Sequence, residues 1–283
     1  MRAEDMRTED IRTEDMRTED MRTEDMRTED MRTEDMRTED MRTEDMRKDD
    51  IRTEDITAAS TCLLRLQDVI KKRNGWRVLD HASVTVRENR IIGVVGDNGI
   101  GKSTLLKLMA GLLRPDGGQI IREEAPPSYI LSGSHFYEWM TADDCAGFYR
   151  DFYPDFDRER ALMLLEQSKI DRRTRLCRLS RGNQERLCMI LGLCRKSRLY
   201  LFDEPFDGID PYFKKDMKRF LLENMADNSS IVMATHLLKD LESLFDEVIF
   251  LADGRVWQME TEEIRMRHHK SVEQYYLEEI KHD

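Results

Sequence analysis

Small and charged residues stand close together in one short segment, GDNGIGKST, which spans Gly96–Thr104. Its three glycines let the backbone curl around an anion, where a Cβ would intrude, and leave N–H groups pointing inward. Lys102 would place a positive charge at the β- and γ-phosphates of a nucleotide, and Ser103 offers a hydroxyl to Mg²⁺. We therefore expect a phosphate-binding loop whose nucleotide contacts come from Gly96, Asn98, Gly99, Gly101, Lys102, Ser103 and Thr104.

Two adjacent acids, Asp203 and Glu204, follow the apolar run Leu199–Phe202 and precede Pro205. Adjacent acids usually mark a solvated turn. Here the apolar run predicts a buried strand, and open α/β sheets bind ligands at the carboxyl ends of their strands. Asp203 would hold Mg²⁺ through its water shell, and Glu204 would orient or deprotonate the attacking water. The pair therefore predicts the hydrolytic half of the same site.

The predicted elements around the first segment fit this chemistry. The apolar run Ile91–Val95 predicts a buried strand, and a helical apolar pattern extends from Lys102 to near Gly111. A strand, a glycine-rich loop and a helix in this order let the loop amides and the helix N-terminus face the same phosphates. Upstream, the folded part begins near residue 56, and Leu63–Val69 and His81–Val86 predict strands joined by a turn at KKRNGWR.

The segment LSRGNQERL resembles the signature sequence of ABC ATPases, which usually reads Leu-Ser-Gly-Gly-Gln. Its Ser180 stands 23 residues before the first acid of the pair, a separation that this family shows. FDGIDP is similar to the family's D-loop, with Asp210 in the aspartate position, and His236 follows an apolar run as the family's switch histidine does. With five elements in the family's order, from Leu63 to about Trp257, the chain resembles an ATP-binding cassette.

The resemblance implies a fold class and a division of the chain. We expect an α/β fold with a RecA-like P-loop NTPase core, an antiparallel β subdomain and a small α-helical subdomain at about residues 135–185. This ABC ATPase domain would occupy residues 56–283 and would follow a low-complexity repeat at residues 1–55. The expected ligands are ATP and Mg²⁺, with Lys102, Glu204 and His236 as the catalytic residues and Ser103 and Asp203 at the metal.

In the family, the site is divided between two cassettes that face each other head to tail. The resemblance then places Ser180 and Gly182 at the γ-phosphate of ATP bound to the partner chain, with Asp210 in the D-loop nearby. His236 would contact the γ-phosphate within its own chain. Because ATP lies between the two cassettes, its hydrolysis opens the dimer and produces motion.

Two positions depart from the family pattern. Ser132 stands where the family has a glutamine that helps hold Mg²⁺, and because serine is shorter we expect it to reach the metal through an extra water. The aromatic residue that usually stacks on adenine is replaced by Arg73, with Trp76 three residues further on. Either could stack on a purine, through a guanidinium plane or an indole ring. A surface tryptophan packed on the neighbouring strand is the structural alternative for Trp76.

The first 55 residues are eleven near-identical pentads of the form Met-Arg-Thr-Glu-Asp. They hold 22 acids and 12 bases, whereas the other 228 residues hold 36 acids and 34 bases, a balance that does not indicate a nucleic-acid-binding surface. A five-residue period spreads the methionines around a helix axis without forming an apolar stripe. We therefore expect a disordered or loosely helical segment, which would be a solvated tail or, alternatively, an acidic tether.

The segment between the two halves of the site is rich in aromatic residues. We expect more than half of them to pack in the core of the helical subdomain, and the density is also consistent with a docking surface. In the family this region receives a short helix of the membrane subunit. The seven residues are Phe136, Tyr137, Trp139, Phe148, Tyr149, Phe152 and Tyr153.

The remaining sequence features concern location and partners. No run of 18 apolar residues is present, and the five cysteines form no CxxC or His-paired metal spacing, as in a cytosolic protein with reduced thiols. The chain looks most similar to the ATP-binding subunits of bacterial multidrug or peptide exporters. We therefore expect a second cassette, identical or different, and a separate integral membrane permease as partners, no nucleic acid, and a cytoplasmic location at the inner face of the cell membrane. The alternative is a soluble ABC ATPase of translation or of DNA and chromosome maintenance.

Overall fold

The computed structural model describes residues 62–133 and 135–281. The pentad repeat, for which the sequence predicts disorder or loose helix, lies outside these residues.

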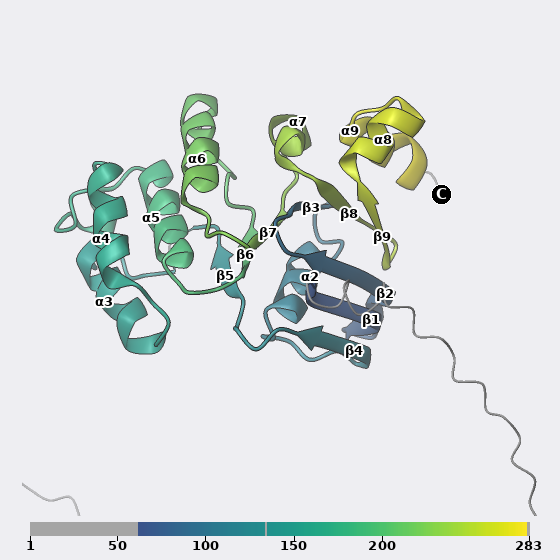
Figure 1. Cartoon of the computed structure of the whole chain (residues 1–283), viewed down its shortest axis with the longest axis horizontal. Helices are drawn as coiled ribbons and strands as arrows, with labels where there is room; N and C mark the ends of the chain where they lie inside the picture. Colours follow the sequence, from purple (N-terminus) through teal and green to yellow (C-terminus); the bar gives the residue numbers. More distant parts are fainter. Residues whose placement is uncertain (1–61, 134, 282–283) are drawn as a thin grey trace, which may run out of the picture. The chain divides into compact units, whose positions relative to one another are not determined.

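In the described part of the chain, the strands form two sheets (Figure 1). The smaller sheet is antiparallel with strand order β2-β1-β4, and its strands are β1 (Cys62–Arg73), β2 (Trp76–Arg87) and β4 (Gly117–Arg122). The larger sheet has the order β5-β6-β7-β3-β8-β9, parallel except for β9 at the edge. Its strands are β3 (Ile91–Val95), β5 (Ser128–Leu131), β6 (Leu199–Asp203), β7 (Ser230–Ala234), β8 (Glu247–Ala252) and β9 (Arg255–Glu260).

Helices cover both faces of the larger sheet, as expected for parallel strands that are buried on both sides. The helices of this region are α2 (Lys102–Met109), α3 (Ala142–Phe152), α4 (Arg158–Gln167), α5 (Arg181–Leu193), α6 (Pro211–Asn224), α7 (Leu238–Leu241), α8 (Thr261–His268) and α9 (Val272–Tyr275). Shorter turns are η1 (Leu176–Arg178), η2 (Glu242–Leu244) and the π-helical η3 (Tyr276–Ile280). None of the helices in residues 62–133 and 135–281 is long and apolar enough to span a membrane.

Alternation along the strands divides the core between the two faces. In β6, Tyr200 and Phe202 pack with α5 and α6, while Leu199 and Leu201 pack on the opposite face with α2 and the antiparallel sheet. Strand side chains alternate in this way because successive Cβ atoms point to opposite faces. As a result, α2 and α5 lie against different faces of the same sheet.

A third apolar cluster joins α3, α4 and α5, which lie side by side in Figure 1. Each of these helices begins at a side-chain cap, which satisfies backbone N–H groups that have no partner within the helix. The caps are Thr141, Asp157 and Ser180, and their side-chain oxygens accept bonds from Asp144, Arg160 and Asn183 respectively. Thr141 forms a full capping box with Asp144.

The predicted fold class is confirmed, and the strand, loop and helix around Gly96–Thr104 form as expected. The expected turn at KKRNGWR is wrong in extent. The strands pair up to Arg73 and Trp76, and the turn itself is Asn74-Gly75, with φ of 51° and 84°. Positive φ at both residues is the geometry of a two-residue hairpin turn that matches the twist of the flanking strands.

The prediction that most of the seven aromatic residues pack inside is also wrong. Three of them, Phe136, Tyr149 and Tyr153, pack against the cluster of α3, α4 and α5. The other four are between 43% and 71% exposed: Tyr137, Trp139, Phe148 and Phe152. Helix periodicity accounts for part of this, because Phe148 and Phe152 are four residues apart on the outer side of α3 and their rings lie 4.3 Å apart.

Candidate functional site

The loop between β3 and α2 is shaped by glycines at which a side chain has no room. Gly101 has φ of 128°, and a Cβ there would lie 2.6 Å from Val78 Cγ1 in β2. A Cβ at Gly96 would lie 2.8 Å from the carbonyl oxygen of Leu251 in β8. The loop is therefore held between both sheets, and its residues lead directly into the first turn of α2, where free N–H groups favour an anion.

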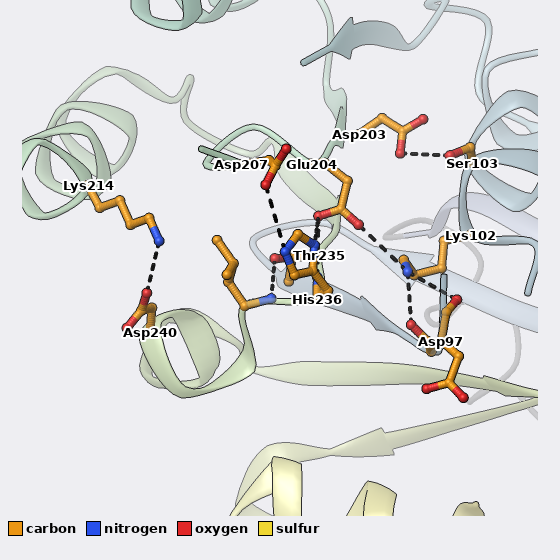
Figure 2. Close-up of polar contacts among 12 residues, drawn as sticks. Asp97, Lys102, Ser103, Asp203, Glu204, Asp207, Lys214, Thr235, His236 and Asp240 are labelled. Carbon is orange, nitrogen blue, oxygen red and sulfur yellow. Dashed lines mark hydrogen bonds and ion pairs between the residues drawn. The ribbon is translucent and has the colours of Figure 1, made fainter. Parts of the chain in front are cut away.

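Lys102 is the first residue of α2, and its side chain is buried, with 6% of the residue exposed. Its ammonium group donates to the carbonyl oxygens of Gly96 at 2.8 Å and Asp97 at 3.3 Å. It also lies 3.6 Å from Glu204 Oε1 (Figure 2). A buried ammonium group requires such partners, and all of them lie at the rim of the loop, where a phosphate could replace them.

Asp203 ends β6 with its carboxylate between two hydroxyl donors. Ser103 Oγ donates to Oδ1 at 3.0 Å, and the Tyr129 hydroxyl donates to Oδ2 at 2.9 Å. Burial, and secondarily the charge of Asp203, raise the pKa of Tyr129 well above its usual range, so the phenol stays a donor. The Ser103 hydroxyl and the Asp203 carboxylate are hard oxygen ligands of the kind that Mg²⁺ prefers, and they lie side by side.

Glu204 lies directly beyond the strand and adopts the left-handed conformation, with φ of 56°. Such a φ is uncommon for a residue with a long side chain, and residues of this kind cluster at functional sites. Its backbone N–H donates to the carbonyl oxygen of Ala234 at the end of β7. The turn directs the carboxylate toward both Lys102 and His236, and Figure 2 shows Glu204 between them.

His236 contacts Glu204 through both its ring and its backbone. Nδ1 lies 2.9 Å from Glu204 Oε2, and the backbone N–H donates to the same oxygen at 3.3 Å. On the other side of the ring, Nε2 lies 3.8 Å from Asp207 Oδ1. The histidine therefore lies between two acids, with 40% of its side chain exposed and thus accessible to a ligand.

Ser132 follows β5, and its backbone N–H donates to the carbonyl oxygen of Asp203. Its hydroxyl donates to Glu185 Oε1 at 3.0 Å, and the same oxygen accepts from the Gly133 N–H at 2.7 Å. Glu185 belongs to α5 and is only 3% exposed, and burial raises the pKa of its carboxyl group. The backbone of Ser132 is therefore bonded to Asp203 of the predicted metal site, whereas its hydroxyl is bonded to Glu185 of α5. A contact between Ser132 and Mg²⁺ stays a prediction.

The signature and D-loop residues occupy helix N-termini. Ser180 caps α5, and Asp210 caps α6 by accepting the N–H of Phe213 at 3.0 Å. A Cβ at Gly182 would lie 2.8 Å from the Phe213 ring, so only glycine fits where α5 meets α6. Within residues 62–133 and 135–281, no hydrogen bond or ion pair connects Ser180 or Gly182 with the loop at Lys102. One chain therefore does not assemble these residues into one site.

A buried arginine joins α5 to α6. Arg186, in α5, is 6% exposed and stacks over the Phe213 and Phe220 rings, with its guanidinium carbon 4.4 and 5.6 Å from their centroids. It also pairs with Asp216 at 2.5 Å. Stacking and pairing together use the planar shape and the charge of the guanidinium group.

Arg73 and Trp76 are paired across the β1–β2 hairpin, and Trp76 is 80% exposed. Val78, two residues further along β2, is the residue that contacts Gly101 of the loop. The turn end of the hairpin therefore lies near the loop, and both candidates for adenine stacking stand at that end. Both side chains are exposed, and adenine stacking by either of them stays a prediction.

Sequence reasoning missed three residues that the structure brings to the site: Tyr129, Glu185 and Asp207. Asp207 lies in the DEPFDGID segment and could have been noticed as a third acid near the pair. Tyr129 and Glu185 give no local signal, because their importance depends on which strand and helix lie next to them.

Comparisons with known proteins show which proteins the chain is similar to. The sequence profile described as "ABC transporter" matches residues 79–207. The chain is 29% identical over 203 residues to the ABC transporter ATP-binding protein YtrB of Bacillus subtilis (strain 168), covering 68% of this chain and 70% of that protein. It is 29% identical over 211 residues to the SkfA peptide export ATP-binding protein SkfE of the same organism, covering 69% and 88% respectively.

Solved structures give the same fold. An ATP-binding subunit of an ABC transporter superposes with a TM-score of 0.68 at 24% identity, covering 76% of this chain and 98% of that one. A nucleotide-free ATP-binding cassette from an ABC transporter gives a TM-score of 0.64 at 20% identity, covering 74% and 96%.

Proposed function

Since this chain carries the ATP-hydrolysing cassette of the ABC transporter family, we propose that it drives export through a separate membrane permease, as one half of a cassette pair. The observation that supports this most is the contact chain from Lys102 through Glu204 to His236. It places a phosphate-binding cation, a carboxylate and an imidazole in contact at the ends of neighbouring strands. A cation at the phosphates and a residue that orients the attacking water are parts that phosphoryl transfer uses.

Each residue has a definite task in this proposal. Lys102 would exchange its carbonyl partners for the β- and γ-phosphates, and the loop N–H groups would hold the same oxygens. Once Lys102 has turned to the phosphates, Glu204 is free to accept a hydrogen bond from water and to orient it for attack. His236 faces Glu204 through Nδ1, so its other ring nitrogen, Nε2, would be the one that meets the γ-phosphate.

Mg²⁺ fits the pair Ser103 and Asp203, because both supply hard oxygen atoms and lie 3.0 Å apart. When bound, the ion would neutralise charge on the phosphates during transfer. Tyr129 would hold the second carboxylate oxygen of Asp203 in place, so that the first oxygen stays directed at the metal. Among the residues that the structure describes, no group of three or more His, Cys, Asp or Glu side chains is placed to hold a metal.

A cassette pair is proposed because the signature residues lie away from the loop within one chain. Ser180 and Gly182 begin α5, which packs on the face of the sheet opposite to α2. In a head-to-tail pair, the N-terminus of α5 would face the phosphates held by the partner's loop, where its free N–H groups and positive potential favour an anion. The second cassette would be another copy of this chain or a different one.

The permease is proposed to bind at the exposed aromatic residues before and within α3. Tyr137 and Trp139 are 71% and 63% exposed and stack on each other with centroids 5.8 Å apart. Large exposed aromatic side chains that lie together are typical of protein interaction sites. Export is proposed as the direction of transport because relatives include SkfE, whose name assigns it to peptide export. The protein would then act at the cytoplasmic face of the membrane, and the alternative of a soluble cassette in translation or DNA maintenance is less well supported by these relatives.

The test is ATP-dependent dimerisation of the Glu204→Gln variant, followed by light scattering on a sizing column. The amide cannot serve as a base, so ATP should remain bound and a dimer should accumulate with Mg²⁺ and ATP, while turnover falls at least a hundredfold. Lys102→Ala should lose nucleotide binding and remain monomeric under the same conditions. Full turnover in the Glu204→Gln variant would remove Glu204 from its role, and a monomer with bound ATP would contradict the cassette pair.

A further inference from the structure

The signature segment has an arginine at the position where the family pattern has its first glycine. Arg181 is the first residue of α5, directly after the cap Ser180, and 58% of its side chain is exposed. Its guanidinium group lies on the D-loop of its own chain. Nη2 lies 3.3 Å from Asp207 Oδ2, and a Cβ on Gly208 would come within 2.3 Å of Nη1.

Asp207 connects this arginine with the hydrolytic residues. One of its carboxylate oxygens pairs with Arg181, and the other lies 3.8 Å from His236 Nε2. His236 in turn contacts Glu204, which pairs with Lys102. A continuous series of polar contacts therefore runs from the signature of this chain to Lys102 of the same chain.

The Arg181–Asp207 contact is of a kind that a phosphate can replace. Both side chains are about half exposed, and ion pairs between exposed side chains contribute little to stability. A guanidinium group binds phosphate oxygens through two parallel hydrogen bonds, which are stronger than a single contact with a carboxylate. Moreover, Arg181 belongs to the same helix turn that carries Ser180, so it faces whatever anion reaches that end of α5.

We propose that Arg181 is a phosphate-binding residue that acts in trans: it leaves Asp207 and binds the γ-phosphate of ATP held by the partner cassette. This inference rests on the cassette pair of the proposed function. When Arg181 leaves, His236 is the side chain that remains near the Asp207 carboxylate among the described ion-pair contacts. Binding of ATP in one site therefore changes the surroundings of His236 in the other. The two sites are coupled through the Arg181–Asp207 and Asp207–His236 contacts.

The first experiment measures the ATP-dependent monomer–dimer equilibrium in the Glu204→Gln background. Arg181→Gly, which installs the residue of the family pattern, should weaken the dimer at least tenfold, since a charge-assisted hydrogen bond to phosphate is lost at each site. Arg181→Lys should recover part of the loss. Binding of a fluorescent ATP analogue to the monomer should not change, because the loop at Lys102 is intact. A dimer of unchanged affinity in Arg181→Gly would overturn the proposal.

Asp207→Asn is the matched control, since it removes the same ion pair from the other side. If the pair only stabilises the fold, Asp207→Asn and Arg181→Gly should weaken the dimer alike, and that result would overturn the proposal. If Arg181 moves to the phosphate, Asp207→Asn removes its competitor, so the dimer should be as tight as in the parent or tighter. Thermal melting of each variant verifies that both are folded.

The second experiment tests action in trans by mixing two inactive chains in an otherwise native background. In a head-to-tail pair of Lys102→Ala with Arg181→Glu, one site combines the intact loop of one chain with the intact signature of the other. ATP retained by this mixture, and turnover near a quarter of the native rate, should appear only on mixing. If Arg181 acted within its own chain, the chain with the intact loop would carry the damaged arginine, and retention would stay absent.

The outcomes separate this inference from the proposed function. A Glu204→Gln parent that fails to dimerise with ATP would overturn the cassette pair and the trans role together. A parent that dimerises, combined with an unaffected Arg181→Gly variant, would leave the cassette pair standing and overturn the role of Arg181 alone.

Discussion

Tyr129 and Asp203 are 74 residues apart in the sequence, yet the Tyr129 hydroxyl donates to Asp203 Oδ2 at 2.9 Å. The two residues meet because β5 and β6 are neighbouring parallel strands in which Leu131 is paired with Asp203. Tyr129 lies two residues before Leu131 on β5, and its long side chain reaches along the sheet surface to the Asp203 carboxylate. This hydrogen bond leaves the other oxygen, Oδ1, to Ser103.

Removing the Tyr129 hydroxyl should loosen the carboxylate at the predicted metal site. Tyr129→Phe is expected to raise the Mg²⁺ concentration needed for half-maximal ATPase activity severalfold, with a smaller effect on kcat at saturating Mg²⁺. Tyr200→Phe is the matched control, because its hydroxyl donates to the carbonyl oxygen of Arg195 away from the site. Mg²⁺ titrations of both variants decide the matter. Equal Mg²⁺ dependence in the two variants would contradict a role for Tyr129 in positioning Asp203.

Glu185 should be more favourable as glutamine at neutral pH. Burial raises its folded pKa above the unfolded value, so the stability that it contributes is complete below the unfolded pKa and is lost as the pH rises through the folded pKa. The amide oxygen of Glu185→Gln can still accept from Ser132 and Gly133. We expect a higher melting temperature at pH 7.5, by about 2–4 °C for each kcal/mol gained in a chain of this size.

The difference between Glu185→Gln and the native chain should shrink toward pH 4, where the carboxyl group becomes protonated in both states. Glu166→Gln, at an exposed position of α4, is the control and should change the free energy of unfolding by no more than about 0.5 kcal/mol. Melting curves from pH 4 to 8 test this. A deficit for Glu185→Gln that grows as the pH rises would contradict this and show that the charge itself is required.

The five cysteines should differ in reactivity by burial. Cys145, Cys188 and Cys194 are buried, and burial raises the pKa of each thiol to about 12, so little thiolate is present near pH 8. Cys177 is exposed. A thiol reagent that releases a chromophore should therefore give a fast phase from Cys177 in the native protein, a slower phase from the half-buried Cys62, and the buried thiols only after unfolding. Loss of the fast phase in Cys177→Ser is the check, and a fast phase that persists there would contradict the assignment.

Trp139→Ala should weaken capture of the membrane subunit, because this side chain is 63% exposed and stacked on Tyr137. The measurement is co-purification of the tagged chain from detergent-solubilised membranes of the host. The ATPase activity of the isolated chain should stay near the native value. Met266→Ala, which removes a 68% exposed apolar side chain from α8, is the control. Equal capture by both variants would place the permease elsewhere.

The sequence predicts the parts of the site that a single segment specifies. Gly96–Thr104 directly follows one strand and leads into a helix, and the acid pair stands at the end of its own strand, so local patterns are sufficient for both. The fold class follows from the same alternation of strands and helices. The hairpin turn was predicted too long, because the strong turn signal of Asn74-Gly75 was spread over its charged neighbours.

The remaining features depend on packing between distant segments. The hydrogen bond from Ser132 to Glu185 requires that the loop after β5 lies against α5. The residue types at the two positions do not indicate this contact. Likewise, a dense aromatic segment indicates burial on average, yet the outer side of α3 leaves Phe148 and Phe152 exposed. Exposure of this kind is set by what the helix packs against, which composition does not specify.

Arg186 stacks over the rings of Phe213 and Phe220 and pairs with Asp216, so α5 is held against α6. Gly182 adds to this, because the Phe213 ring occupies the space where a side chain would be. Displacing one helix without the other would break a buried cation–ring contact and open a gap in the core. In the proposed cassette pair, Ser180 and Asp210 should therefore reach and leave the partner cassette together, so we expect closure to be a single concerted event.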